Sequence, residues 1–285
     1  MSIQLRRGVA ADADECGRIC FEAFKVIADR HSFPWDFPSP EVAAGLLSML
    51  LQHPLFHGVV ATREGKIVGS NFLDERSSVV GIGPISVDPT TQQRGVGRLL
   101  MEHVLARAAE KHAPGVRLVQ AGYNNQTLCL YTKLGFRTRE PLSLMNGTLP
   151  RVKLAGYEVR HASKGDIELC NQLCRKLHGH DRERELIDAI EAKTATVVER
   201  QGRITGYATS IAFFAHAVGE TNQDLIALIG AASSIAGPGI LVPTRNHELF
   251  SWCLENGLGL VFQMTLMSIG LYNEPTGPYL PSVLY

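Results

Sequence analysis

The sequence predicts an α/β protein in which two domains of similar fold follow one another along the chain. Its 285 residues are about twice the length of an average domain. Hydrophobic residues make up 45% of the chain and charged residues 20%, which suffices for two buried cores. Segments of the first half also recur in the second half in the same order. Length, composition and repetition together indicate a tandem pair.

The first repeated segment relates residues 3–20 to residues 157–174, which lie 154 positions later. The identical positions are Arg6 and Arg160, Asp12 and Asp166, Cys16 and Cys170, and Cys20 and Cys174. Each copy is typical of a short strand, a turn and a helix whose two cysteines are separated by one helical turn.

The second repeated segment relates residues 60–69 to residues 197–206 at a smaller offset of 137, and both copies predict a β-hairpin with a glycine in its turn. Near the end of each half, at offsets of 121 to 122, Asn125, Tyr131, Leu144 and Met145 align with Asn246, Trp252, Leu266 and Met267. Because the offset falls, we expect the second copy to lack the turn and helix equivalent to residues 31–53. We also expect it to be shortened between its hairpin and its last helix.

Apolar periodicity with glycine and proline punctuation predicts the elements of the first half. Helices are expected at 12–30, 40–53, 95–112 and 125–134, and strands at 3–6, 57–63, 66–76, 79–88, 116–121 and 136–146. The expected division is a first domain at 1–148, a linker at 149–156 and a second domain at 157–285.

The charge balance argues against nucleic-acid and anionic-membrane partners, because 28 basic and 28 acidic residues leave no net charge. Residues 225–244 are uncharged and about long enough to span a bilayer, but serines and a Gly-Pro-Gly turn interrupt them. A buried helix, a turn and a buried strand explain this segment better. Without an apolar N-terminal leader and with six cysteines, the chain is expected to be cytoplasmic.

The segment that most strongly suggests a binding site is ISVDPTTQQRGVGRLL at residues 85–100. A strand ends at Asp88, and a turn containing Arg94, Gly95, Gly97 and Arg98 opens an amphipathic helix. Unpaired amides at a helix N-terminus bind anions, and glycines allow close approach to them. The spacing fits neither a Rossmann turn nor a Walker motif. An ordinary strand–turn–helix remains the alternative interpretation.

The order Val-Asp-Pro, then Gln92-x-x-Gly95-x-Gly97, resembles motif A of the GNAT superfamily, the acyl-CoA-dependent N-acyltransferases. The following segment, with Asn124, Leu130-Tyr131 and Gly135-Phe136, resembles motif B of that family. The resemblance covers residues 3–146 and implies a mixed, mostly antiparallel twisted sheet with helices on both faces in each domain.

The resemblance also implies that acetyl-CoA binds as co-substrate between the strands at 79–88 and 116–121. A bulge in the first strand would use Gly81, Gly83 and Pro84. The residues that the resemblance assigns to acetyl-CoA are Ile85, Ser86, Val87, Gln92, Gln93, Arg94, Gly95, Val96, Gly97, Arg98, Asn124 and Tyr131.

By the same resemblance, Tyr131 is the general acid that protonates the departing thiolate, although a half-buried structural aromatic is the alternative. A backbone amide near Val87 would polarise the thioester carbonyl. The general base stays open, since the strand at 79–88 has no carboxylate before Asp88. The alternatives are Asp36, Glu75, His31, a water chain and the C-terminal carboxylate of Tyr285.

The amine acceptor is expected near residues 31–40, which are rich in aromatic residues and proline. Phe33, Trp35 and Phe37 would either line an apolar pocket with Asp36 or hold the loop in place. The cysteine pairs are interpreted as small core residues, and no metal is expected. The second half carries Glu220 where the first has its glycine turn, and Trp252 where the first has Tyr131. We therefore expect it to bind no acyl-CoA and to complete the acceptor cleft or a subunit interface.

These features predict an N-acetyltransferase that moves an acetyl group from acetyl-CoA to a primary amine of a small molecule or peptide, by direct attack in a ternary complex. The alternative is a non-catalytic acyl-CoA-binding or sensing protein. Either would be a monomer or a homodimer.

Overall fold

The computed structural model describes residues 2–91 and 95–284, and the chain forms two compact units. Unit 1 extends to Arg137 and also contains Ser268–Leu271 and Leu284. Unit 2 contains Thr138–Met267 and Tyr272–Val283. These units differ from the expected domains in one respect. The strand expected at 136–146 lies almost entirely in unit 2, and a segment from the C-terminal half of the chain lies in unit 1 instead.

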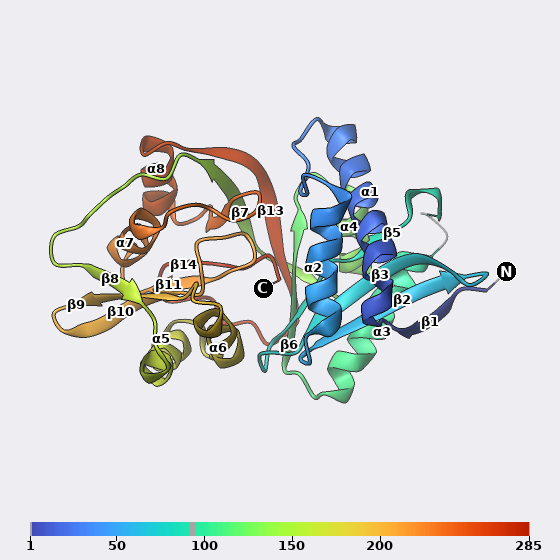
Figure 1. The fold of residues 1–285 in the computed structure, drawn as a ribbon, viewed down its shortest axis with the longest axis horizontal. Helices are drawn as coiled ribbons and strands as arrows, with labels where there is room; N and C mark the ends of the chain where they lie inside the picture. Colours follow the sequence, from blue (N-terminus) through green and yellow to red (C-terminus); the bar gives the residue numbers. More distant parts are fainter. Residues whose placement is uncertain (1, 92–94, 285) are drawn as a thin grey trace. The chain divides into compact units, whose positions relative to one another are not determined.

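The elements of unit 1 follow the expected order closely (Figure 1). Its helices are α1 (Ala13–His31), α2 (Pro40–Gln52), α3 (Val96–Glu110) and α4 (Asn125–Lys133), and short 3-10 turns lie at Ala10–Asp12 and Pro89–Thr91. Its strands are β1 (Gln4–Arg7), β2 (Phe56–Arg63), β3 (Lys66–Asp74), β4 (Val80–Ile82), β5 (Ser86–Val87) and β6 (Gly115–Ala121). The strand expected at 79–88 is thus divided into β4 and β5.

The sheet of unit 1 has the order β1-β2-β3-β4-β6, followed by the end of β13 (Leu258–Gly270). Neighbours from β1 to β4 are antiparallel, whereas β4 and β6 are parallel. The end of β13 is held beside β6 by close backbone contact, since the Leu271 amide donates to the Pro114 carbonyl at 2.8 Å. A side chain at Gly115 would place its Cβ 2.5 Å from the Leu271 carbonyl oxygen, so only glycine fits there.

Helices cover both faces of this sheet, as two adjacent residues of β3 show. The Ser70 hydroxyl bonds the Cys16 thiol of α1. The Asn71 amide reaches the Leu100 carbonyl of α3 at 3.4 Å. Because successive side chains of a strand point to opposite faces, α1 and α3 lie on opposite sides of the sheet. The mixed, mostly antiparallel sheet with helices on both faces is confirmed.

Unit 2 is built in the same way. Its helices are α5 (Ile167–His178), α6 (Glu183–Glu191), α7 (Asn222–Ala231) and α8 (His247–Glu255), with a 3-10 turn at Lys164–Asp166. Its strands are β7 (Arg137–Gly147), β8 (Glu158–His161), β9 (Thr196–Arg200), β10 (Arg203–Ala208), β11 (Ala217–Gly219), β12 (Ile240–Pro243), β14 (Tyr279–Leu280) and most of β13. The strand orders are β14-β11-β10-β9-β8 and β13-β7-β12. Val197 packs with α5 and α6, while its neighbour Val198 packs with α7, so helices again cover both faces.

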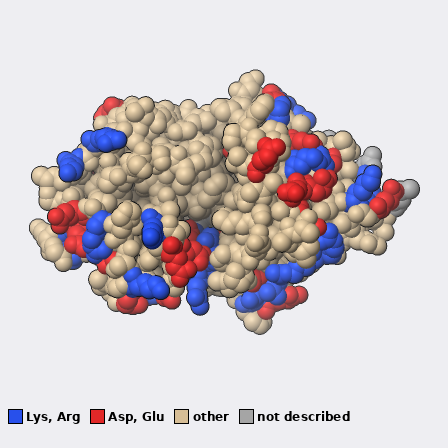
Figure 2. All heavy atoms as spheres, viewed as in Figure 1, with Lys and Arg blue, Asp and Glu red and all other residues tan. Residues whose placement is uncertain are grey.

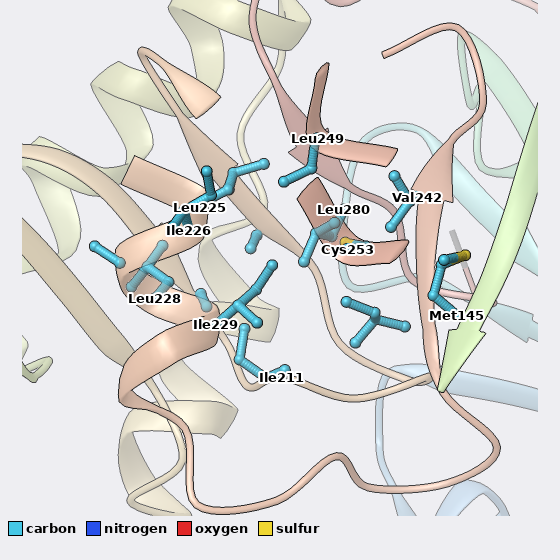
Figure 3. Packing of buried hydrophobic residues seen from close by; sticks show 14 of the residues in the cluster. Met145, Ile211, Leu225, Ile226, Leu228, Ile229, Val242, Leu249, Cys253 and Leu280 are labelled. Carbon is cyan, nitrogen blue, oxygen red and sulfur yellow. The ribbon is translucent and has the colours of Figure 1, made fainter. Parts of the chain in front are cut away.

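The segment at 225–244 forms part of the largest apolar cluster described in unit 2 (Figure 3). Leu225 and Ile229 of α7 are fully buried, as are Val242 of β12 and Leu249 of α8. The expected buried helix, turn and buried strand are confirmed. Among the described residues, no helix is long and apolar enough to cross a membrane.

The repeat seen in the sequence has a common structural basis. Asp12 accepts two bonds from Arg6, at 2.7 and 2.8 Å, and Asp166 accepts two from Arg160 at 2.8 Å. Each aspartate caps the turn that leads into the first helix of its unit. The four repeated cysteines are free and fully buried, which confirms their place in the core. One expectation is wrong: the second copy keeps its second helix, α6, and is shorter because its helices and loops are shorter.

Replacing Asp166 with alanine is expected to lower the free energy of unfolding by about 1–2 kcal/mol at pH 7, because it removes the cap and the partner of Arg160. The bonds from Arg160, together with those from Ser163, hold the pKa of Asp166 well below its usual range. Its contribution is therefore present above pH about 4 and declines as the pH falls further. Urea unfolding at pH 7 and pH 3 measures this difference, with Glu158→Ala on exposed β8 as control. Equal losses at both pH values would contradict this account.

Candidate active site

The candidate site begins where β4 and β6 separate. Their parallel pairing is recorded at Val80 with Val116 and at Gly81 with Arg117. On the other side, Ile82 pairs with Leu73 and Ser86 pairs with Ser70. Four steps along β4–β5 therefore match three steps along β3, which means that one extra residue lies between Ile82 and Ser86. This is the expected bulge, and in the described chain β5 pairs with β3 alone.

The first turn of α3 lies beside this opening. Its N-cap is Gly95, whose positive φ of 81° favours glycine, and among the described residues no side chain caps the helix. A Cβ built on Gly97 would lie 3.7 Å from a methyl carbon of Val87 and 3.9 Å from one of Leu130. The start of α3, strand β5 and helix α4 therefore meet at Gly97. The amides of this first turn lack helical acceptors and form a place for an anion.

The other residues expected to bind acetyl-CoA divide into three groups. Gln92, Gln93 and Arg94 lie outside the described residues. Ile85 is partly exposed and lies in the irregular segment between β4 and β5. The Ser86 hydroxyl lies 3.4 Å from that of Ser70 and bonds Cys20. The backbone of Ser86, and not its side chain, is therefore available to a ligand at the opening.

Arg98 and Val96 complete the first turn of α3. The Arg98 guanidinium is exposed and donates through Nε to Glu102 at 2.8 Å. Val96 is buried and anchors the turn. An anion at the start of α3 would therefore be bound mainly by backbone amides. The Arg98 guanidinium is partly engaged by the Glu102 carboxylate.

Helix α4 brings Asn124 and Tyr131 to the same region. The Asn124 side chain caps the helix by accepting from the Thr127 amide at 3.3 Å. Tyr131 is only 5% exposed, and its ring packs edge-on against Phe136 at 6.1 Å. No described residue hydrogen-bonds its hydroxyl. Burial raises the pKa of Tyr131 above its usual value, so the phenol keeps its proton at neutral pH.

The aromatic loop between α1 and α2 is pinned at three points. Phe33 stacks on Tyr123 at 4.5 Å, just after β6. Trp35 is turned to the exposed side of α1, where its Nε1 donates to Asp29 at 2.7 Å. Phe37 is buried against Phe24. These contacts hold the loop in place, and they put Phe33 beside the residue Tyr123 that follows β6.

Asp36 lies in this pinned loop and is partly buried. Burial raises the pKa of its carboxyl to about 6. It is close enough to Tyr123 and to Cys20 of α1 to raise the pKa of both. No hydrogen bond or ion pair to another described side chain engages its carboxylate. Asp36 is thus a carboxylate that gains and loses its proton near neutral pH.

The other candidate bases are placed differently. Glu75 accepts from Arg107 at 2.7 Å and from Lys111 at 3.1 Å. Burial alone would raise the pKa of Glu75, but these two cations outweigh it and lower the pKa. His31 is exposed, and its Nδ1 lies 2.9 Å from the Ile27 carbonyl. Tyr285 lies outside the described residues.

The equivalent helix start in unit 2 is closed. Asp224 caps α7 by accepting from the Thr221 amide and hydroxyl at 2.8 Å. Glu220 beside it bonds Arg203 at 2.7 and 2.9 Å. A carboxylate therefore already engages the backbone amide of the N-cap residue of α7.

The last helix of unit 2 shows that part of the sequence repeat was aligned one position out of register. Asn246 caps α8 as Asn124 caps α4, each accepting at 3.3 Å from the amide three residues later. Counting from these caps, the position of Tyr131 is taken by the buried Cys253 and not by Trp252.

Gln120 is a buried polar residue next to α4 that the sequence did not single out. It lies on β6, is 5% exposed and contacts the Thr127 hydroxyl at 3.0 Å. One available signal was its polarity near the end of an otherwise largely apolar strand, GVRLVQA.

On the face of the molecule that Figure 2 shows, acidic and basic side chains lie intermixed, as the balanced composition predicts.

Part of the first half of the chain matches a known protein family. Residues 54–138 match the family described as acetyltransferase (GNAT) domain. A D-amino-acid N-acetyltransferase of Saccharomyces cerevisiae is 32% identical over 117 residues, covering 38% of this chain and 73% of the yeast protein.

Two solved structures share the fold over almost the whole chain. One, from Pyrococcus horikoshii, has a TM-score of 0.75 at 17% identity and covers 97% of this chain and 92% of its own. The other is a tandem GNAT protein from the clavulanic acid biosynthesis pathway, with a TM-score of 0.59 at 11% identity, covering 94% of this chain and 98% of its own. The fold is thus that of two tandem GNAT-like domains. With the family match and the yeast relative, this establishes that the chain is an acyltransferase of the GNAT superfamily.

Proposed function

We propose that the enzyme transfers an acetyl group from acetyl-CoA to a primary amine of a small molecule or peptide, in a ternary complex formed by unit 1. The observation that carries this proposal is the junction at Gly97, where the start of α3, the bulged strand and the helix of Tyr131 meet. The helix start would bind the diphosphate of the co-substrate. The separation of β5 and β6 would receive its pantetheine arm.

Two side chains of this site would handle the protons of the reaction. The Asp36 carboxylate accepts a proton from the ammonium form of the acceptor and leaves a neutral amine. As the nitrogen attacks the carbonyl carbon and the carbon–sulfur bond breaks, the Tyr131 hydroxyl donates its proton to the sulfur. The nitrogen releases its second proton to solvent as the neutral amide forms, and the amide and the free thiol of CoA leave. Proton exchange with solvent then restores Tyr131 and Asp36.

The first acceptors to test are D-amino acids, because the yeast relative is named for acetylating them. Thiol released from acetyl-CoA is followed with D-amino acids, L-amino acids, polyamines and short peptides in parallel. Thiol release that requires one of these amines, with the acetylated product seen by mass spectrometry, supports the proposal. Acetyl-CoA binding without amine-dependent release from any of them would favour the sensing role instead.

We further propose that unit 2 binds no acyl-CoA. The Asp224 and Glu220 carboxylates at the start of α7 support this, because their negative charge lies where a phosphate would bind and would repel it. Calorimetric titration is expected to give one site per chain. A second site of similar affinity would contradict the proposal.

The proposed base makes the pH dependence specific. We expect kcat/KM for the acceptor to rise as the pH passes through about 6, where Asp36 loses its proton. Asp36→Asn is expected to remove this rise and to lower kcat by about 100-fold or more. Because burial raises the pKa of Asp36, its charge opposes folding at pH 7–8. The same variant should therefore be slightly more stable than wild type there and not at pH 4.

Asp14→Asn on α1 is the matched control, since it makes the same chemical change at an exposed residue outside the proposed acceptor site. A pH profile of Asp36→Asn that keeps the rise near 6 would exclude Asp36 as the base.

A further inference from the structure

The side-chain amide of Gln120 has one polar atom without a partner. The residue is 5% exposed, yet its Nε2 has no hydrogen-bond partner among the described residues. Its Oε1 lies 3.0 Å from the Thr127 hydroxyl. A buried amide group that lacks a partner costs free energy in the folded protein. Its presence in the core of a strand therefore calls for a ligand.

The same conclusion holds for either orientation of the amide. The Thr127 hydroxyl has a single proton and also lies 2.9 Å from the Asn124 carbonyl oxygen. If the proton goes to Asn124, the Gln120 amide turns to donate to Thr127, and its oxygen becomes the atom without a partner. Thr127 engages one end of the amide in both cases and leaves the other end open.

Gln120 lies on the part of β6 beyond its recorded pairing with β4. Gln120 follows Arg117, the last residue of β6 that pairs with β4, by three positions. Its contact with Thr127 places it on the α4 face of the sheet. Val87 of β5 lies on that face too, since it and Leu130 of α4 flank Gly97. Thr127 and Tyr131 are four residues apart and share one side of α4.

We infer that the Gln120 amide binds a secondary amide of the pantetheine arm, which makes it a binding residue for the acyl donor near Tyr131. This inference rests on the proposed function. A secondary amide carries one N–H and one C=O, so it satisfies the open end of Gln120 in either orientation. Gln120 thereby fixes how deep the arm enters, and it sets the position of the sulfur against the Tyr131 hydroxyl.

The test compares two ligands on the full chain by calorimetry. One is CoA, and the other is its 3′-phospho-ADP fragment, which lacks the arm. Gln120→Leu is expected to weaken CoA binding about tenfold, because an arm amide then stays buried without a partner. Binding of the fragment is expected to stay within about twofold of wild type, a range that is small beside the loss of one such bond. Gln172→Leu on α5 of unit 2 is the matched control and should change neither.

Thermal unfolding of the ligand-free variant separates a binding role from a structural one. Gln120→Leu removes an unsatisfied polar atom, and Thr127 keeps its bond to Asn124, so the midpoint should equal or exceed that of wild type. Gln120→Met gives a second, unbranched replacement should leucine not fit.

Equal loss of both ligands, or unchanged binding of both, would overturn the inference while leaving the proposed function in place. A lower midpoint with unchanged CoA affinity would assign Gln120 to the core. Failure of wild type to bind either ligand would instead overturn the proposed function itself.

Discussion

Replacing Tyr131 with phenylalanine is expected to lower kcat by about 100- to 10,000-fold, with the KM for acetyl-CoA little changed. The change removes only the hydroxyl, which no described residue hydrogen-bonds, and keeps the ring that packs against Phe136. Burial raises the pKa of this phenol, so it carries its proton at neutral pH. Steady-state kinetics with the acceptor identified in the amine screen measures the effect.

The leaving group gives a sharper version of this experiment. A thiolate that is already stable needs no proton as it departs. An acetyl thioester of an acidic aryl thiol should therefore react at similar rates with wild type and Tyr131→Phe. Tyr157→Phe in unit 2 is the matched control, since Tyr157 lies outside the proposed site. If Tyr131→Phe keeps the wild-type kcat with acetyl-CoA, Tyr131 is a core aromatic and the acid lies elsewhere.

Gly97→Asp is expected to weaken acetyl-CoA binding by at least about 100-fold. The new carboxylate would sit at the start of α3, compete for its amides and repel the diphosphate, and such like-charge contacts cost several kcal/mol. The fold should persist for two reasons. The Cβ meets Val87 and Leu130 at ordinary contact distances of 3.7 and 3.9 Å, and acidic residues stabilise a helix N-terminus.

Two further variants isolate the charge at this position. Gly97→Ala adds the same Cβ without the carboxylate, so it should lose much less affinity than Gly97→Asp. Gly45→Asp adds a carboxylate on α2 at a glycine whose Cβ would meet nothing within 4 Å, and it should bind as wild type does. Wild-type affinity in a folded Gly97→Asp would show that the phosphates bind elsewhere.

The secondary structure of unit 1 was largely predictable because its signals are local. Proline at the start of α2, glycine at the start of α3 and apolar spacing within α1 each act over a few residues. The glycine turn at residues 95–97 predicted the start of α3 for the same reason. The repeated Arg-x₅-Asp motif was also readable, since Asp12 caps a turn within its own segment.

The features that escaped prediction depend on tertiary contacts. That Gln120 has an open amide follows from which face of β6 meets α4, and no pattern within GVRLVQA specifies that. Burial raises the pKa of Asp36, whereas the pKa of Glu75 is lowered because Arg107 and Lys111 reach it from more than thirty residues later in the chain. The match of Cys253 with Tyr131 required the two asparagine caps, because sequence alignment alone placed Trp252 there.

The segment Ser268–Leu271, which belongs to unit 1, is synthesised long after most of that unit. Unit 1 holds its candidate site within the first 137 residues, yet its sheet is completed beside Pro114 and Gly115 by residues translated more than 150 positions later. At common rates of translation this interval lasts on the order of ten seconds. During that time the nascent N-terminal half has an open sheet edge, which is a site for aberrant pairing. Ribosome-bound chains of increasing length should therefore gain protease resistance in unit 1 only once Leu271 has emerged.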